Sequence, residues 1–529
     1  MFHFDRLYLL VFLPVVLIVY SLFKPKYRKY VLLAASYFLF YSISKKLIIY
    51  ILLSTLSIHH LGIWLENIEL KKTKALESVD KEEKKIIKEK YQKEKKRVLL
   101  FGVLLHIGLL LVLKYSPFFA TNINSLLHLL NIRYTICVPK FVLPIGISFY
   151  TLMAVSYIVD VYRGKINAEN NIVKLALFLS FFPYLIEGPI VKYDECSDTL
   201  FEGKKLDYKN VTFGAQRIAY GVMKKIVVAD RLNLLIKMVF SNYSEFSGTV
   251  AFLAAICYTI QLYMEFSGTM DVAIGSAEMF GIKLPENFRA PFFSKTISEF
   301  WQRWHITLGR WFKDYIYYPL SLSKPLKKVM NFGRKHLGNY YGPLLSGTVA
   351  LLAVWFSNGL WHGAAWKYIF FGLYHFTLIL LNNLFEPLKR NICAKLKINR
   401  QSKLYRIVQI IIVFNLVVIG EMFFRADTLN DGFRMLGLIL TDFNFKNIID
   451  GTFLTLGLDL CDFAITLITL VIVFIISLMR EKDISIREIV AKKPIVVRWL
   501  IYYVFIMFIL IFGAYGANYV PIGPIYAEF

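Results

Sequence analysis

Long hydrophobic runs recur along the whole chain, and polar residues collect in the segments between them. The clearest runs are Leu7 to Phe23, Tyr30 to Ile43, Leu47 to Leu65, Val98 to Leu113, Ile172 to Ile186, Val250 to Met264, Leu344 to Phe356, Tyr368 to Leu384, Ile407 to Phe424, Phe453 to Leu478 and Trp499 to Phe512. A helix needs about 17 to 25 apolar residues to cross a bilayer. Several runs are shorter, which predicts tilted, broken or re-entrant segments besides simple spans. The first run lacks a basic start followed by a small-residue cleavage site, so we expect a retained span.

Composition agrees with this pattern and identifies the class of protein. Of the 529 residues, 57% are hydrophobic and only 19% are charged, which is too apolar for a soluble enzyme of ordinary surface. The sequence therefore predicts an all-α polytopic membrane protein.

The net charge of +25 comes from basic segments between the hydrophobic runs, so it does not indicate nucleic-acid binding. These segments are Lys24 to Lys29, Lys71 to Arg97, Lys324 to His336, Lys389 to Arg406 and Arg480 to Arg498. The positive-inside rule assigns them to the cytoplasm. Their order along the chain then places both the N-terminus and the C-terminus outside the cytoplasm.

Residues 66–97 are the one stretch of clearly soluble character, with both charge signs at helical spacing. We expect a solvated cytoplasmic helical hairpin here. A docking site for a cytoplasmic protein is the alternative, although charge runs of this kind usually only solvate a loop.

Glycine, proline and charged residues repeatedly interrupt the hydrophobic stretches between Pro144 and Pro319. Broken elements are tolerated at membrane depth only where protein or a water-filled cavity surrounds them. A buried site is therefore expected in this part of the chain.

Two histidines lie in unusual surroundings. His362 lies in "WFSNGLWHGAAW", between two hydrophobic segments and beside Gly359 and Gly363. Glycine permits close backbone approach, and an ionisable residue at such a place is a functional candidate. A core histidine bonded to a neighbouring carbonyl is the alternative. His305 lies in "SKTISEFWQRWHITLGRWFKDYIYYP", which predicts a single amphipathic interfacial helix ended by Pro319.

These two histidines admit several kinds of chemistry. A neutral imidazole can take a proton from an alcohol that attacks an ester or thioester, without a metal or bound cofactor. Acyl transfer to a hydroxyl is one interpretation, and proton relay in a transporter is another. A metal site that also includes His375 lacks carboxylates or thiols at ligand spacing, and we expect His375 to pack. The five cysteines show no CxxC spacing and predict buried free thiols.

Several motifs are specific in combination. They are "FSGTMDVAIGSAEMFGIKLPENFRAPFFSKTISEFWQRWHITLGRWFKDYIYYPL", "GLWHGAAWKYIFFGLYH", "PIGISFYTLMAVSYIVDVYRG", "GVMKKIVVADRLN", "EMFFRADTLNDGFRML" and the terminal "PIYAEF". Together they resemble the membrane-bound O-acyltransferase (MBOAT) family, in the branch of the alginate O-acetylation membrane proteins. The resemblance implies a ring of roughly 11 to 13 tilted transmembrane helices, with re-entrant or interfacial helices around a central channel. It also implies a catalytic core at 98–425, preceded by transmembrane helices at 1–65 and the charged loop 66–97, and followed by transmembrane helices at 426–529.

The same resemblance implies a function. It is an O-acetyltransferase of the plasma membrane that takes an acetyl group from a cytoplasmic donor, acetyl-coenzyme A, to acetylate an extracellular polysaccharide. No bound cofactor or metal is implied. His362 of the WHG motif is the implied catalytic residue, and His305 is the second functional histidine. The implied substrate or channel residues are Trp304, Arg303, Asp271, Trp361 and Glu265. The implied partners are membrane lipids, an extracellular SGNH-type acetyltransferase and a polysaccharide synthase complex.

Two alternatives to this function stay open. Within the family, the teichoic-acid D-alanylation branch takes its acyl group from a carrier protein, and "APFFSKTISEFWQRWH" resembles that branch too. Its members are typically shorter and lack the late spans. Outside the family, a transporter of a lipid-linked sugar is the rival. The chain also departs from alginate-type members at Met270, which replaces a small polar residue before Asp271 and leaves the polymer and the partner open.

Overall fold

The computed structural model describes residues 4–77, 80–515, 519 and 523. Over these residues the chain forms helices and one isolated β-bridge, between Phe288 and Trp304. The all-α prediction is therefore confirmed. The terminal "PIYAEF" motif lies outside the described residues.

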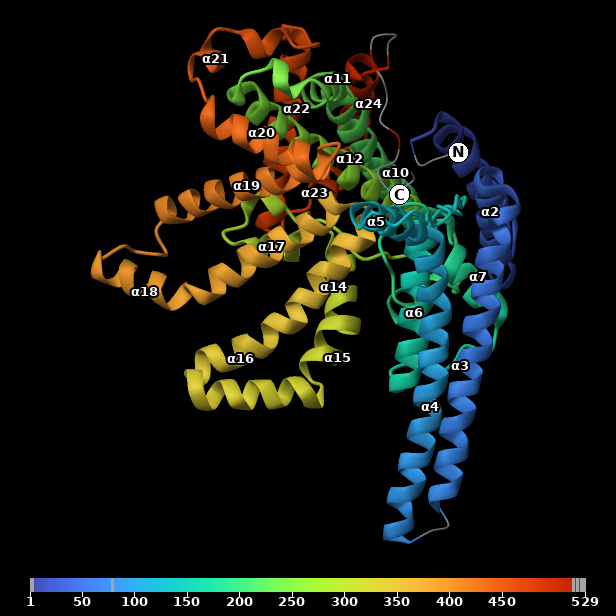
Figure 1. Ribbon diagram of the computed structural model, residues 1–529. Coiled ribbons are helices and arrows are strands. Elements are labelled where there is room, and N and C mark those ends of the chain that lie inside the picture. The colour runs from blue at the N-terminus through green and yellow to red at the C-terminus, as the bar shows by residue number, and fades with distance from the viewer. Residues whose placement is uncertain (1–3, 78–79, 516–518, 520–522, 524–529) are drawn as a thin grey trace. The chain divides into compact units, whose positions relative to one another are not determined.

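The chain divides into two compact units (Figure 1). One contains the chain up to Ala215 together with Ala273–Pro285, and the other contains Gln216–Val272 and the chain from Glu286 onward. The elements of the first unit are η1 (Tyr8–Phe12), α1 (Leu13–Leu22), α2 (Pro25–Ser44), η2 (Lys45–Leu47), α3 (Ile48–Glu77), α4 (Lys81–Leu110), η3 (Leu111–Tyr115), α5 (Ser116–Leu129), α6 (Ile147–Arg163), α7 (Ile172–Ser180), α8 (Phe182–Leu185) and α9 (Tyr193–Leu200). Two helices pass from one unit to the other, α10 (Tyr208–Met223) and α12 (Gly248–Met279).

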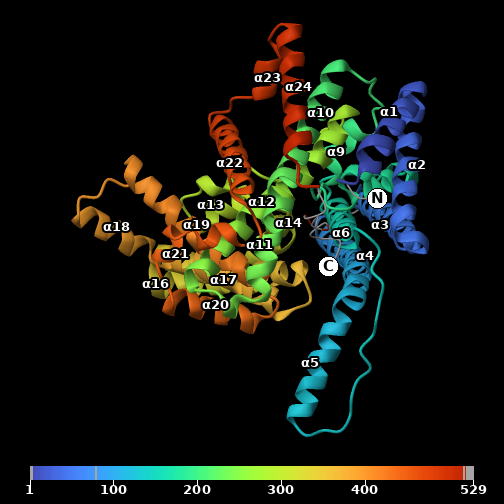
Figure 2. The same ribbon diagram turned by 90° about the horizontal axis from the view of Figure 1, so that it is seen from above.

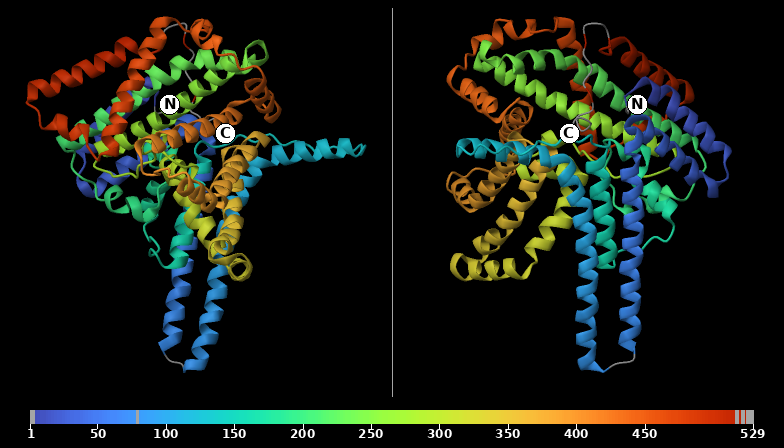
Figure 3. Two further views of the ribbon diagram at one scale, coloured as in Figure 1. Left: turned by 90° about the vertical axis from the view of Figure 1, so that its left-hand side faces the viewer. Right: turned by 45° about the vertical axis from the view of Figure 1, so that its right-hand side comes forward.

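The charged segment 66–97 is helical, as predicted, but its helices are not separate from the hydrophobic runs. α3 begins in one run and continues to Glu77, and α4 begins at Lys81 and continues into the next run. The two helices lie side by side, as the long blue pair in Figures 1 and 3 shows. An ion pair of 2.7 Å joins Lys95 to Glu69. Beyond η3, α5 turns away from this pair (Figure 2).

The second unit holds the segments that were expected to surround a site. Its elements are η4 (Lys224–Ala229), α11 (Asp230–Ser241), η5 (Tyr243–Glu245), η6 (Pro291–Phe293), α13 (Ile297–Arg303), α14 (Ile306–Phe312), η7 (Lys313–Tyr317), α15 (Tyr318–Ser321), α16 (Lys324–His362), α17 (Trp366–Leu384), α18 (Glu386–Lys395), α19 (Lys403–Arg425), α20 (Leu429–Thr441), α21 (Lys446–Ile449), η8 (Thr452–Thr455), α22 (Leu460–Glu481), α23 (Ile486–Ala491) and α24 (Ile495–Phe512). α16 is broken at Gly338, whose φ of 79° is left-handed, so its two arms run in different directions.

Helices that could cross a membrane are fewer than the roughly 11 to 13 expected. In the described chain, seven helices or joined helices are long and apolar enough, or eight if the bent pair α17 and α18 is one span. The difference arises because several hydrophobic runs fold into short or broken helices, as Ile172 to Ile186 does in α7 and α8. The chain is a multi-span membrane protein.

The cysteines are free, as predicted, but two of them are exposed and Cys257 is only partly buried. Cys137 and Cys461 are exposed, whereas Cys196 and Cys393 are buried. Cys137 lies in the non-helical stretch after α5, and Cys461 lies in the first turn of α22.

Candidate active site

His362 is the last residue of α16, which ends where the Gly363 N–H donates a hydrogen bond to the Leu360 carbonyl (3.1 Å). The glycines around it are explained by helix packing. A Cβ atom at Gly359 would lie 2.5 Å from the Tyr368 carbonyl oxygen, and one at Gly372 would lie 2.3 Å from the Trp355 carbonyl oxygen. α16 and α17 therefore pack backbone against backbone, and this contact fixes the helix end that carries His362.

His305 interrupts the segment that was predicted to be one helix. α13 ends at Arg303 and α14 begins at Ile306, while His305 adopts φ 47° and ψ 50°. That left-handed conformation costs about 1 kcal/mol or more in a residue with a side chain. Hydrogen bonds to the segment 287–289 impose it: the Ile306 N–H donates to the Asn287 carbonyl (3.0 Å), and the Arg289 N–H donates to the Arg303 carbonyl (2.9 Å). Helical periodicity in the sequence does not reveal backbone pairing with another segment. The single-helix prediction is therefore wrong.

The predicted helix end at Pro319 is also wrong. Pro319 lies in the first turn of α15, where its missing N–H has no helical partner to lose. Helical structure therefore continues through η7 and α15 to Ser321.

His305 and His362 line the same cavity of about 800 Å³. Its walls come from α13, α14, η7, α16 and α17, and include Trp301, Trp304, Trp355 and Asn358. The two histidines are 3% and 5% exposed. The indole of Trp361 contacts both imidazoles, with ring centroids 5.6 Å from His305 and 5.2 Å from His362. The cavity thus brings the two candidate catalytic residues together.

The protonation of His305 suits a hydrogen-bond acceptor. Burial lowers its pKa well below the ordinary value, and the neighbouring His362 lowers it further. The imidazole of His305 is therefore neutral at pH 7 and can accept a proton or a hydrogen bond.

Two polar groups of the cavity wall were not among the predicted site residues. The Trp301 Nε1 and the Asn358 Oδ1 have no hydrogen-bond partner in the described part of the chain. An indole N–H can only donate and a carboxamide oxygen can only accept, so these two buried atoms are a donor and an acceptor that the described residues leave unsatisfied. The signal for Asn358 was its spacing, because a residue four positions before His362 lies on the same face of α16.

The other predicted residues near the histidines have different surroundings. Trp304 lines the cavity. Arg303 is absent from the cavity lining. It pairs with Glu299 within α13 at 2.9 Å and with Glu481 at 2.5 Å, and the second pair ties α13 to α22. His375 is fully buried, with its ring centroid 4.8 Å from that of Trp301, as expected for packing. Among the described residues, no group of three histidine, cysteine or acidic residues could hold a metal ion.

Asp271 and Glu265 lie on α12 in buried ion pairs and are absent from the cavity lining. Asp271 pairs with Arg217 (3.0 Å) and with Lys224 (2.6 Å), and Glu265 pairs with Lys225 (2.8 Å). Sequence reasoning missed these three basic partners. The available signal for Lys224 and Lys225 was "GVMKKIVVAD", because cations within an apolar segment require buried partners.

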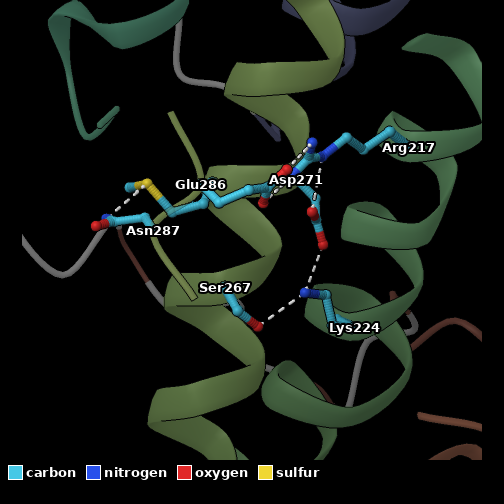
Figure 4. Close-up of polar contacts among 7 residues, drawn as sticks. Arg217, Lys224, Ser267, Asp271, Glu286 and Asn287 are labelled. Carbon is cyan, nitrogen blue, oxygen red and sulfur yellow. Dashed lines mark hydrogen bonds and ion pairs between the residues drawn. The ribbon is translucent and has the colours of Figure 1, made fainter. Parts of the chain in front are cut away.

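Arg217 connects this cluster to the chain that leads to His305. Its guanidinium forms two hydrogen bonds with the carboxylate of Glu286, at 2.7 and 2.6 Å, and Lys224 donates to the Ser267 hydroxyl at 2.8 Å. Figure 4 shows Arg217 of α10 and Lys224 of η4 on Asp271, and Glu286 of the segment after α12 on Arg217. Glu286 immediately precedes Asn287, so the ion cluster anchors the segment that pairs with His305.

Comparison with known proteins identifies the family of the chain. Residues 165–333 match the model of the membrane-bound O-acyltransferase family. The chain is 32% identical over 437 residues to the probable alginate O-acetylase AlgI of Pseudomonas syringae pv. tomato, a match that covers 83% of this chain and 74% of that protein.

Two further relatives carry other activities in their names. The peptidoglycan O-acetyltransferase of Helicobacter pylori is 30% identical over 64% of this chain and 63% of its own length. The teichoic acid D-alanyltransferase of Bacillus subtilis is 28% identical over 53% of this chain and 68% of its own length. All three names describe acyl transfer, and the chain is accordingly an O-acyltransferase that belongs to the membrane-bound O-acyltransferase family.

Proposed function

We propose that the protein takes an acetyl group from acetyl-coenzyme A on the cytoplasmic side of the plasma membrane, for the O-acetylation of an extracellular polysaccharide. The observation that carries the proposal is the cavity that His305 and His362 share. The names of the Pseudomonas and Helicobacter relatives support acetyl as the group transferred.

The proposed reaction uses residues of this cavity. His362 takes the proton of a hydroxyl group while that oxygen attacks the thioester carbonyl carbon. The new C–O bond forms as the C–S bond breaks, and the proton passes from His362 to the leaving thiolate. His305 positions the reacting groups. The Trp301 N–H is suited to the carbonyl oxygen, which gains negative charge in the transition state.

We further propose that the attacking hydroxyl belongs to an extracellular partner of the SGNH type. That partner would complete the transfer to a polymer made by a neighbouring synthase complex. The basic segments between the hydrophobic runs support this direction, because the positive-inside rule favours a cytoplasmic location for them.

The test compares His362→Ala with His336→Ala in cells that carry the variant as their source of the protein. His336 is exposed and lies outside the cavity, so its replacement is a matched control. Polymer yield and ester-linked acetate per sugar are measured in both. For His362→Ala we expect unchanged polymer yield and at least about a 100-fold loss of ester-linked acetate per sugar. His336→Ala should change neither quantity.

The other outcomes separate the rival functions. Loss of polymer yield with normal acetate per sugar contradicts acyl transfer and favours a transporter. Loss of ester-linked D-alanine from a teichoic acid, with acetate unchanged, favours the D-alanylation branch instead.

A further inference from the structure

Asn287 holds the turn that contains His305. It is completely buried, and its backbone carbonyl accepts the hydrogen bond of Ile306 on one side of that turn. Its side-chain Oδ1 accepts hydrogen bonds from the backbone N–H and the hydroxyl of Thr307, both at 3.0 Å. One asparagine therefore holds the residues that follow the left-handed backbone of His305.

The orientation of the Asn287 carboxamide follows from these donors. A backbone N–H can only donate, so the atom that faces the Thr307 nitrogen is the carboxamide oxygen. The same oxygen lies 3.3 Å from the Nδ1 of His305. Because that oxygen can only accept, Nδ1 carries the proton in this contact. In a neutral imidazole Nε2 is then the accepting nitrogen.

The carboxamide is itself held from two directions (Figure 4). Its Nδ2 group donates to the sulfur of Met270 on α12, at 3.1 Å. Met270 is followed by Asp271 and Asn287 is preceded by Glu286, and Arg217 binds both of these carboxylates. The ion cluster thus fixes both the backbone of Asn287 and the sulfur that its amide contacts.

We propose that Asn287 is a positioning residue for acyl transfer, which holds His305 in the tautomer with its proton on Nδ1 and leaves Nε2 as an acceptor. The inference rests on the proposed function for its chemical meaning. It specifies the role of His305: this residue accepts a hydrogen bond from the attacking hydroxyl or from His362, and does not donate one to the thioester carbonyl.

The surroundings of His305 allow a test by pH. Phe266 of α12 and Trp361 of α16 face its ring, with centroids at 4.8 and 5.6 Å, and both are uncharged. The titratable group that acts on it is His362, and the charged side chains in the cavity lining are those of Arg310 and Lys313. Burial and His362 lower the pKa of His305 well below its ordinary value, so its imidazole is neutral near pH 7. A carboxylate at position 287 would favour the imidazolium and raise the pKa of His305.

Asn287→Asp is the decisive variant, because it keeps the accepting oxygen and the shape of the side chain while it adds a negative charge. His305 must be neutral to accept a hydrogen bond at Nε2, so activity is lost as the pH falls through the pKa of His305. We expect kcat/KM of the variant to fall about tenfold between pH 8 and pH 6, because the added carboxylate brings protonation of His305 into this pH range, with little change in the unmodified protein. Asn287→Leu should lower kcat about 100-fold at every pH, with KM for acetyl-coenzyme A unchanged.

Asn242→Asp serves as the matched control. Asn242 is exposed and its amide donates to the Met238 carbonyl, far from the histidine turn in the sequence and outside the cavity lining. Its replacement by aspartate adds the same charge and should leave the pH profile unchanged. Asn287→Thr takes the place of the leucine variant if that variant does not accumulate.

A second readout needs no turnover. Diethyl pyrocarbonate acylates the unprotonated nitrogen of an imidazole, and mass spectrometry of the peptide that contains His305 gives the rate of labelling. We expect the labelling rate to fall toward pH 6 in Asn287→Asp and to stay level in the unmodified protein. The same labelling profile in both, with more than half of the kcat kept in Asn287→Leu, would overturn the inference. If His305→Gln keeps full acetyl transfer, the proposed role of His305 in catalysis fails, while the labelling still decides the positioning.

Discussion

His305 and His362 lie on different helices and line one cavity, where the Trp361 indole contacts both imidazole rings. A different structural feature holds each histidine in place. Glycine-mediated packing of α16 on α17 fixes the helix end at His362, and pairing with the segment 287–289 fixes the turn at His305. Because these two features involve different residues, a substitution can change one of them without the other.

The indole N–H of Trp301 is expected to stabilise the thioester oxygen. Trp301→Phe keeps an aromatic ring against His375 and removes the donor, so kcat should fall about 100-fold while protein yield is kept. Acetyl transfer from labelled acetyl-coenzyme A in purified membranes measures this. Trp499→Phe, on the exposed face of α24, is the control and should be neutral. Equal kcat in the two variants would show that Trp301 only packs.

The contact of α16 with α17 predicts a strict requirement for glycine. Gly359→Ala forces a Cβ atom to within 2.5 Å of the Tyr368 carbonyl oxygen, so the helices must separate. We expect a loss of about 1 to 3 kcal/mol in stability, measured as a lower thermal midpoint in detergent. A Cβ atom at Gly437 of α20 meets no atom within 4 Å. Gly437→Ala should therefore be neutral, or stabilising by up to about 1 kcal/mol. If the thermal midpoints of Gly359→Ala and Gly437→Ala are equal, the packing argument is contradicted.

Asp271 is expected to act through stability. Asp271→Asn leaves Lys224 and Arg217 buried without their shared carboxylate, and breaking a buried pair costs about 3 to 5 kcal/mol. Asp483, which forms an exposed ion pair with Arg289, provides the control. Asp483→Asn should lower the free energy of unfolding by about 1 kcal/mol or less. Thermal unfolding and the activity per folded molecule are measured together. If Asp271→Asn keeps its stability but loses acetyl transfer, Asp271 contacts substrate as first predicted.

The two exposed cysteines test the direction of the chain across the membrane. The proposed orientation, which follows from the basic segments, predicts that Cys137 and Cys461 lie outside and that Cys393, which is buried, lies on the cytoplasmic side. A membrane-impermeant maleimide added to intact cells should label Cys137 and Cys461. Permeabilised cells show the total label, with Cys137→Ser and Cys461→Ser as controls for each site. Labelling of these cysteines only after permeabilisation would contradict the proposed orientation.

Much of the fold followed from local patterns. Hydrophobic runs predicted the membrane class and the helices, and charge spacing predicted the helical segment 66–97. The WHG motif singled out His362 because an ionisable residue between apolar segments needs a reason to be there. The break at His305 could not be predicted this way. Its periodicity is helical, and the turn exists because residues 287–289 pair with residues 303–306.

The sequence by itself determined the kind of protein and its candidate histidines, since hydrophobicity, charge placement and motifs are properties of neighbouring residues. Tertiary structure decided which residues surround those histidines. Arg217, Lys224 and Asp271 find one another, and Asn287 finds His305, only after α10, η4, α12 and the turn before α14 have packed. The physical reason is that burial of a charge or an amide demands a partner, but the sequence does not say which distant segment supplies it.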